Sequence, residues 1–244
     1  LKSKIKSAMV YPFMVCGATF VIGIIMMIFA VPKLKESFVE LEVELPFTTK
    51  VVLGFADFLS KKWPLAILIL IGLLVCFTLL LKSKKGGRIK SGLILKIPIF
   101  SGLARETNSA LTLRTLSSLL KAGVPIVHSL QITAGALGNF YFKQSLKEAA
   151  EAVEKGEKLS QSLKPYEKIY SPMVLQMMEI GEETGETPEV LEKLAEFFEE
   201  EVSNATQRLS SIIEPVLILF IGGIVGFFAV SMMQPMFSIM GGIK

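Results

Sequence analysis

The sequence predicts an all-α membrane protein with three transmembrane helices and one cytoplasmic bundle of about six helices. The 244 residues are 51% hydrophobic and only 20% charged, and their mean hydropathy is +0.56. These values lie far above those of a typical soluble domain. Three apolar stretches are long enough to cross a bilayer, and elsewhere apolar residues recur at helical spacing with almost no polar and apolar alternation.

The predicted transmembrane helices cover residues 8–31, 63–81 and 212–233. At 1.5 Å per residue, each stretch reaches across roughly 30 Å of hydrocarbon. The first stretch is not a signal peptide, because its apolar run is too long and lacks a small-residue cleavage pattern. The sequence therefore predicts a polytopic protein.

Basic residues in short flanking segments indicate the orientation, because such residues stay on the cytoplasmic side. Lys2, Lys4 and Lys6 place the N-terminus inside, and the basic linker of residues 82–91 contains no acid. Residues 32–62 carry five lysines against five acids, among them the alternating Glu40, Glu42 and Glu44, and are expected to form an extracytoplasmic loop. The tail of residues 234–244 then lies outside as well.

The first and third predicted spans resemble each other when the sequence is shifted by 203 positions. The identities are Ser7 with Ser210, Pro12 with Pro215, Gly23 with Gly226 and Pro32 with Pro235. A duplicated unit, made of a cytoplasmic domain followed by a span, explains this match. The chain also begins at Leu1, so residues 1–7 are expected to be the end of a missing upstream cytoplasmic domain.

The cytoplasmic domain, residues 92–211, contains the start and stop signals of helices. A helix with an apolar face from Leu111 to Leu120 is expected to end at Gly123, and Pro125 is expected at the first position of the next helix. Further helices are expected from Asn139 to Glu154, over Leu159–Leu163, from Pro172 to near Gly185, and from Thr187 onward. The last one has no stop signal before the third span and should enter the membrane as one rod.

Scarce residue types exclude several classes of enzyme. Asp57 and His128 are the only aspartate and histidine, and the predicted topology puts them on opposite sides of the membrane, which excludes a Ser-His-Asp triad. Cys16 and Cys76 lie in apolar runs, so neither a disulfide framework nor a thiolate metal site is expected. P-loop, HExxH and GxSxG motifs are absent from the sequence. No cofactor is expected, and only four arginines make nucleic acid an unsuitable partner.

Residues 179–201 hold ten glutamates and one basic residue, Lys193. A solvated helix surface explains this composition, and so does a docking surface for a basic partner. A third interpretation is a site for a hard cation such as Ca²⁺ or Mg²⁺. Its ligands would be Glu179, Glu182, Glu183 and Glu186, which fall at helical spacing.

Polar and small residues mark the third span. Glu214 precedes Pro215 at the cytoplasmic edge, where a charge avoids the cost of membrane depth. Gly222 and Gly226 form a GxxxG pattern, which lets two helices approach closely and predicts an oligomer contact. The basic residues from Lys82 to Lys90 are interpreted first as a signal for membrane topology. A second interpretation is a contact with anionic lipid head groups.

Five short motifs, in order along the chain, resemble one protein family. They are Ala8-Met9-Val10-Tyr11-Pro12, Leu119-Leu120-Lys121-Ala122-Gly123-Val124-Pro125, Ile180-Gly181-Glu182-Glu183-Thr184-Gly185, Ile213-Glu214-Pro215 and Gln234-Pro235-Met236-Phe237. The sequence resembles the inner-membrane platform proteins of type IV pilus and type II secretion machines, the F family of secretion proteins. The resemblance covers essentially the whole chain. The family-motif positions are Tyr11, Pro12, Gly123, Val124, Pro125, Gly181, Glu182, Gly185, Glu214, Pro215 and Pro235.

The resemblance implies two homologous helical-bundle domains, three spans, no enzymatic activity and a place in the cytoplasmic membrane of a bacterium or archaeon. It also implies partners: a hexameric cytoplasmic assembly ATPase, pilin or pseudopilin subunits, other inner-membrane assembly proteins and further copies of the chain. The ATPase-facing surface is expected at Glu183, Glu186, Glu189, Glu192 and Glu196. The alternative function is a small transporter or channel subunit, but only Thr19 and Thr78 are polar near mid-span. An intramembrane enzyme would need span acids or histidine, which the spans lack.

Overall fold

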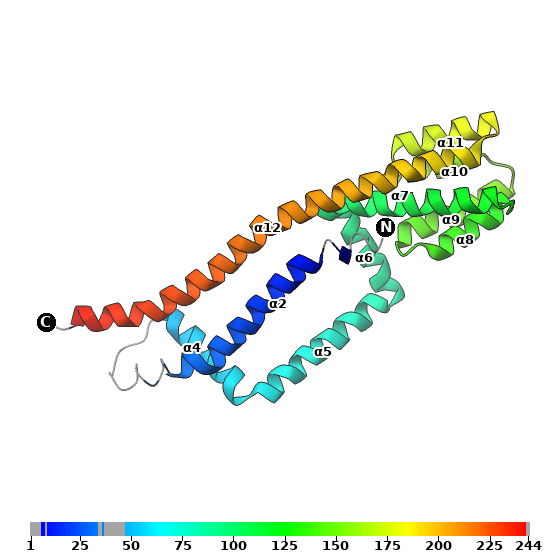
Figure 1. Ribbon diagram of the computed structural model, residues 1–244. Coiled ribbons are helices and arrows are strands. Elements are labelled where there is room, and N and C mark those ends of the chain that lie inside the picture. The colour runs from blue at the N-terminus through cyan, green and yellow to red at the C-terminus, as the bar shows by residue number, and fades with distance from the viewer. Residues whose placement is uncertain (1–5, 8, 34–35, 37–46, 243–244) are drawn as a thin grey trace. The chain divides into compact units, whose positions relative to one another are not determined.

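The computed structural model describes residues 6–7, 9–33, 36 and 47–242, and every regular element in this part of the chain is a helix (Figure 1). The all-α fold class is therefore confirmed for the described residues. The elements are α2 (Val10–Ile25), the π-helix η1 (Met26–Ala30), α4 (Phe47–Lys61), α5 (Trp63–Lys82), α6 (Lys84–Lys96), α7 (Pro98–Lys121), α8 (Ile126–Ala136), α9 (Phe140–Glu154), α10 (Leu159–Leu163), the 3₁₀ helix η2 (Lys164–Tyr166), α11 (Pro172–Thr184) and α12 (Thr187–Gly242).

Residue contacts divide the chain into two compact units. The first, here called the bundle, comprises Leu1–Ser7 and Leu79–Leu209, and the second, here called the apolar unit, comprises Ala8–Thr78 and Ser210–Lys244. The 56-residue helix α12 contributes residues to both units. The predicted third span, residues 212–233, lies within α12, which continues through Pro215.

Local capping signals set the helix boundaries of the bundle. The Asn139 side chain accepts a hydrogen bond from the Tyr141 backbone N–H at 3.0 Å, so Asn139 caps α9 as predicted. Ser171 likewise caps α11 by accepting from the Val174 N–H. Gly123, Gly156 and Gly185 have positive φ angles at the ends of α7, α9 and α11. Glycine adopts this conformation without the steric cost that a Cβ imposes, which explains why three predicted helix ends are confirmed.

The basic linker predicted over residues 82–91 is instead part of helix α6. The Ser83 hydroxyl accepts a hydrogen bond from the Gly86 N–H at 3.0 Å and caps the helix. A Cβ at position 86 would lie 1.8 Å from the Leu80 carbonyl oxygen, so this tight turn requires glycine. The Gly86-Gly87 pair therefore belongs to the first helical turn, whereas such pairs usually indicate a loop.

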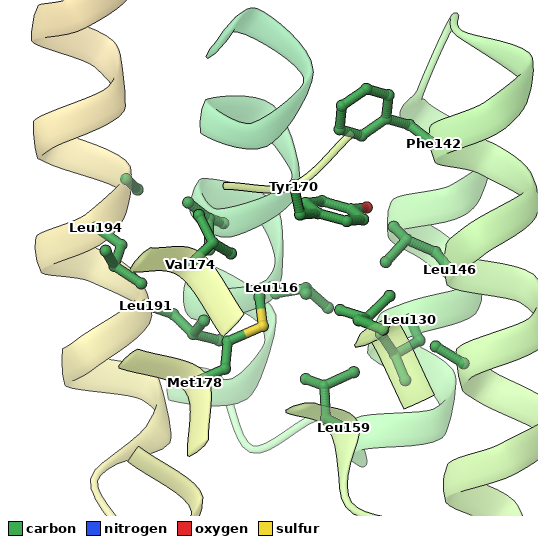
Figure 2. Packing of buried hydrophobic residues seen from close by; sticks show 14 of the residues in the cluster. Leu116, Leu130, Phe142, Leu146, Leu159, Tyr170, Val174, Met178, Leu191 and Leu194 are labelled. Carbon is green, nitrogen blue, oxygen red and sulfur yellow. The ribbon is translucent and has the colours of Figure 1, made fainter. Parts of the chain in front are cut away.

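Apolar side chains from α7 to α12 meet in one core within the bundle (Figure 2). From the predicted apolar face of α7, Leu113 and Leu116 are fully buried, while Leu111 and Leu120 pack at the edge of the core. The other large buried members include Leu130, Phe142, Leu146, Leu159, Leu163, Tyr170, Val174, Met178 and Leu191. Burial of this many large side chains is the main favourable contribution to folding of the bundle.

Tyr170 shows how the core accommodates a polar group. The ring is 1% exposed and packs edge-on against Phe142, with 5.0 Å between the ring centroids. Its hydroxyl lies 3.1 Å from the Ser145 hydroxyl, and burial raises the pKa of Tyr170 to about 12. The phenol therefore stays neutral at physiological pH and is satisfied by hydrogen bonding.

Two helices among the described residues are long and apolar enough to cross a membrane, namely Val10–Lys33 and Thr187–Met233. They contain most of the first and all of the third predicted span. The second predicted span, residues 63–81, corresponds to the 20-residue helix α5, within which Ile71–Leu81 forms a shorter apolar stretch. The count of three spans stays a prediction.

The predicted extracytoplasmic loop, residues 32–62, contains the 15-residue helix α4. Val52, Leu53 and Ala56 of this helix pack with Val31 and Met232 in a small apolar cluster. The Thr49 hydroxyl donates a hydrogen bond to the Ser231 carbonyl oxygen at 2.6 Å. Helix α4 therefore joins the ends of two apolar helices within the apolar unit. The glutamates at positions 40, 42 and 44, and Lys2 and Lys4, lie outside the described residues.

Candidate functional site

Four exposed glutamates form one acidic face at the start of α12. We call Glu186, which directly precedes the helix, and Glu189, Glu196 and Glu200 within it the acidic face, because helical spacing turns them toward the same side. Lys193 shares this side and lies 3.9 Å from Glu196, but its side chain is 80% exposed. Exposed ion pairs of this kind contribute little stability. The negative charge of this face is therefore available to a basic partner.

Two other glutamates of α12, each about one third exposed, pair with basic side chains of α7. The Glu199 carboxylate accepts two hydrogen bonds from the Arg114 guanidinium, at 2.8 and 2.9 Å. Glu192 pairs with Lys121 and also approaches Arg114. The hydrogen bond from Lys121 lowers the pKa of Glu192, and the one to Glu199 raises the pKa of Arg114. Glu192, predicted to face a partner, thus serves an internal contact, because two basic side chains of α7 lie opposite it.

Glu182 caps the start of the short helix α10. Its carboxylate accepts hydrogen bonds from the backbone N–H groups of Leu159 and Ser160 and from the Ser160 hydroxyl. Leu159 and Ser160 are almost completely buried, at 2% and 1% exposure. Helix starts leave backbone donors without intrahelical partners, and a carboxylate satisfies them well. Glu182 therefore has a structural role in connecting α11 to α10.

The four glutamates predicted as cation ligands do not converge. Glu182 faces α10, while the neighbouring Glu183 lies 3.3 Å from Lys158 across an exposed ion pair. Gly185 ends α11 before Glu186, as its φ of 77° shows. Within the part of the chain that the structure describes, no three His, Cys, Asp or Glu side chains are grouped closely enough to hold a metal ion.

Gly181 lies at a close approach of α11 to the start of α12. A Cβ at this position would be 3.1 Å from the Thr187 Cα and 3.2 Å from the Val190 Cβ. These distances are tighter than ordinary van der Waals contact, so a side chain at position 181 would force the two helices apart. The motif Gly181-Glu182 thus places the C-terminal end of α11 against two neighbouring helices, α12 through Gly181 and α10 through Glu182.

The motif at residues 123–125 forms a Schellman turn after α7. The Gly123 N–H donates to the Leu120 carbonyl oxygen and the Val124 N–H to the Leu119 carbonyl oxygen, at 2.9 and 3.0 Å. Pro125 was predicted at the first position of the next helix, but it lies one residue earlier, as the cap before Ile126. Its carbonyl oxygen already accepts a hydrogen bond from the Ser129 N–H, so the proline still initiates α8.

A groove of about 490 Å³ opens beside these turns within the bundle. Its apolar lining includes Leu120, Ile126, Val153 and Pro188, and its polar lining includes Glu157, Lys158 and Glu182. The C-terminal turns of α7 and α9 and the start of α12 all border it. This end of the bundle therefore combines an apolar depression with nearby acidic side chains, which suits a partner segment that carries both apolar and basic groups.

The motif residues of the apolar unit lie on its long helices. Tyr11 is 60% exposed, whereas Pro12 is buried. Glu214 and Pro215 are exposed on α12, and Gly222 and Gly226 have open space where a Cβ would point. Pro235 falls within the bounds of α12. Two exposed glycines one helical turn apart leave no side chain on that part of the surface, which permits the close approach of another helix.

Sequence reasoning missed Arg114, Lys121 and Lys158, the basic partners of the acidic segment. No local pattern marks them, because each lies 25 to 85 residues from its glutamate. Helix α6 was also missed, although Ser83 and the apolar positions Ile89 and Leu93 carried a detectable signal.

Comparison with known proteins supports the resemblance. The model of the type II secretion system protein F family matches residues 112–235. The type IV pilus assembly proteins PilC of Pseudomonas aeruginosa and Thermus thermophilus are each 35% identical to this chain, over 98% and 99% of its length and 64% and 59% of their own. The type II secretion system protein F of Pseudomonas aeruginosa is 27% identical over 98% of this chain and 58% of the relative.

The chain thus spans between 58% and 64% of the length of these relatives. The family match covers half of the chain, and it includes the turn at Gly123, the Gly181-Glu182 contacts and the apolar end of α12. Both kinds of relative, from pilus assembly and from secretion, carry the resemblance over nearly the whole sequence. On this evidence the chain belongs to the type II secretion system protein F family.

Proposed function

We propose that this protein is a non-enzymatic platform in the cytoplasmic membrane that couples an assembly ATPase to pilin or pseudopilin subunits. The names of its relatives support service in either a type IV pilus or a type II secretion machine. The observation that carries the proposal is α12, one helix that bears the acidic face in the bundle and continues into the apolar unit. Work done on the bundle by another protein can pass along such an element to the membrane.

The proposed topology has three spans, a cytoplasmic N-terminus and an extracytoplasmic C-terminus. The apolar helices α2 and α12 support two of the spans. The length of α5, 20 residues, supports the third, since roughly 20 apolar residues suffice to cross the hydrocarbon. The basic residues that follow α5 support a cytoplasmic bundle.

The proposal that the protein is not an enzyme is supported by the positions of its only aspartate and its only histidine. The only aspartate, Asp57, belongs to the apolar unit, and the only histidine, His128, is exposed on the bundle. A Ser-His-Asp mechanism would need these two side chains in one site. The energy for moving subunits must then come from the ATPase.

Charge reversal of the acidic face tests the ATPase contact. We expect the double variant Glu186→Lys/Glu189→Lys to lower co-purification with the ATPase about tenfold or more, because like charges would then face the basic partner surface. Wild-type co-purification should itself weaken as salt is raised. The measurement is quantitative pull-down of the full chain in detergent at two salt concentrations.

The matched control is Glu151→Lys/Glu167→Lys, which makes the same change in net charge at two other exposed glutamates of the bundle. It should bind the ATPase as the wild type does. Equal binding by all three proteins, or equal loss in both variants, would remove the acidic face from the proposal.

The proposal also includes packing between copies through Gly222 and Gly226. Both positions are exposed on α12 and have no neighbouring atoms within 4 Å of an added Cβ. We expect Gly222→Leu/Gly226→Leu to shift cross-linked oligomers toward monomer, since bulky side chains keep helix backbones apart. Ile224→Leu is the control, because Ile224 is exposed on the opposite side of the same helix, and it should leave the oligomer intact. An unchanged cross-linking pattern in the glycine variant contradicts this contact.

A further inference from the structure

Helix α6 has one face that packs into the bundle. Ser91 is 6% exposed, and its hydroxyl accepts a hydrogen bond from the Phe140 N–H at 3.0 Å. At position 92 a Cβ would lie 3.2 Å from the Tyr141 hydroxyl, so the helix backbone runs close to α9. Leu95 packs against the edge of the core. These contacts fix which side of α6 faces inward.

The opposite side of α6 exposes apolar residues one helical turn apart. Ile89 is 69% exposed and Leu93 is 56% exposed. At 100° per residue, both lie roughly opposite Ser91 and Leu95. Lys90 and Lys96 are exposed and fall on either side of this stripe. We call Ile89, Leu93, Lys90 and Lys96 the outer face of α6.

The charged residues in the sequence around α6 are all positive. Between Asp57 and Glu106 the sequence contains nine basic residues and no acid. No ion pair with another described residue involves Lys90 or Lys96. The guanidinium carbon of Arg88 lies 5.4 Å from the centre of the Phe140 ring. This cation–π contact leaves the positive charge of Arg88 without a neutralising acid. An apolar stripe flanked by uncompensated lysines is the pattern of helices that bind anionic membrane surfaces.

In the chain, α6 directly follows a helix that is proposed to cross the membrane. The helix begins two residues after the end of α5, which is proposed to span the membrane. The turn between them is tight, because only glycine fits at position 86 beside the Leu80 carbonyl oxygen. The outer face is thus tied closely to the cytoplasmic end of a membrane helix.

We propose that the outer face of α6 docks on the anionic head groups of the cytoplasmic leaflet, with Ile89 and Leu93 at the hydrocarbon boundary and Lys90 and Lys96 at the lipid phosphates. This contact is an attachment of the bundle to the bilayer in addition to α12. The inference rests on the proposed topology, in which α5 ends at the cytoplasmic surface, and it is independent of ATPase binding. Phospholipid is the occupant, since its negative head group and apolar chains match both features of the face.

The test places an environment-sensitive fluorophore at position 93 of the full chain in lipid nanodiscs. The background carries Cys16→Ala and Cys76→Ala, because both cysteines are exposed, and the label is attached to Leu93→Cys. In nanodiscs that contain phosphatidylglycerol we expect a blue-shifted emission that spin-labelled lipid quenches. In nanodiscs of pure phosphatidylcholine, the blue shift and the quenching should both be much smaller. Each of Lys90→Gln and Lys96→Gln should lower the docked fraction relative to the undocked one about fivefold.

The same label at Gln176→Cys, an exposed position on α11, is the control and should report an aqueous environment in both lipids. Three results would overturn the inference: no lipid quenching at position 93, equal quenching in neutral and anionic nanodiscs, or a blue shift that spin-labelled lipid leaves unchanged. The last result would indicate that protein covers the face. ATPase pull-down of the same variants separates the two proposals, because Lys90→Gln and Lys96→Gln should bind the ATPase normally.

Discussion

Replacing Glu182 with alanine is expected to lower the free energy of unfolding of the bundle by about 2–4 kcal/mol. The carboxylate accepts the backbone N–H groups of Leu159 and Ser160 together with the Ser160 hydroxyl. Both residues are almost fully buried, which limits the access of water to the donors that lose their acceptor. A buried donor that loses its partner costs its full desolvation penalty, which exceeds the net value of an ordinary hydrogen bond. Glu182→Gln retains an acceptor without the charge and should lose less.

Hydrogen exchange of the full chain in detergent measures the loss of these hydrogen bonds at the amides that make them. In Glu182→Ala the amides of Leu159 and Ser160 should exchange faster, and the bundle should become sensitive to pulse proteolysis at a lower denaturant concentration. Glu183→Ala is the matched control, since Glu183 is the next residue and makes only an exposed ion pair with Lys158. That variant should change stability by less than about 1 kcal/mol. Equal effects of the two substitutions would show that the cap does not stabilise α10.

The helices of the bundle could be predicted because their ends depend on short stretches of sequence. Asn139 and Ser171 cap helices through donors two and three residues ahead. Gly123, Gly156 and Gly185 end helices through their own φ angles. Such helix ends can be predicted from the sequence, because the interacting groups lie within about one helical turn of each other.

The connections between helices could not be predicted in the same way. The partners Arg114 and Glu199 are 85 residues apart, and Glu182 is 22 residues from Ser160. By composition, residues 179–201 form one acidic segment. In the folded bundle, however, its glutamates point toward different neighbours. Glu192 and Glu199 pair with α7 and Glu182 with α10, while Glu183 and the acidic face remain exposed. Which glutamates of such a segment are free for a proposed docking surface therefore depends on the packing of the helices.

The two missed helices have a different explanation. Helix α4 carries buried apolar residues at Val52, Leu53 and Ala56 and exposed ones at Val51 and Phe55. The buried residues have the spacing of one helix face, so α4 carried a local signal, but the charge balance of residues 32–62 led to the prediction of a loop. Helix α6 starts with lysines and two glycines, which have the composition of a loop. In both helices, tertiary contacts to a neighbouring helix outweigh weak local propensity.

A side chain at Gly181 is the second substitution with a large expected effect. Gly181→Leu should lower the free energy of unfolding by about 3 kcal/mol, and Gly181→Ala by about 1 kcal/mol. A Cβ there would already press on the Thr187 Cα, which is backbone at the start of α12 and cannot rotate away. The added volume must therefore separate α11 from α12, which weakens the contact that places the acidic face.

The same two substitutions at Gly135 provide the control. Gly135 lies in helix α8, is exposed, and has open space around an added Cβ. Without a clash, replacing a helical glycine gains helix propensity, so Gly135→Ala and Gly135→Leu should raise stability by about 0.5–1 kcal/mol. Pulse proteolysis of all four variants should therefore give opposite signs at the two positions. Destabilisation at Gly135, or a neutral Gly181→Leu, would contradict the close approach of α11 and α12. If Gly181→Leu folds but loses ATPase binding while Gly181→Ala keeps it, the α11–α12 contact also orients the acidic face for its partner.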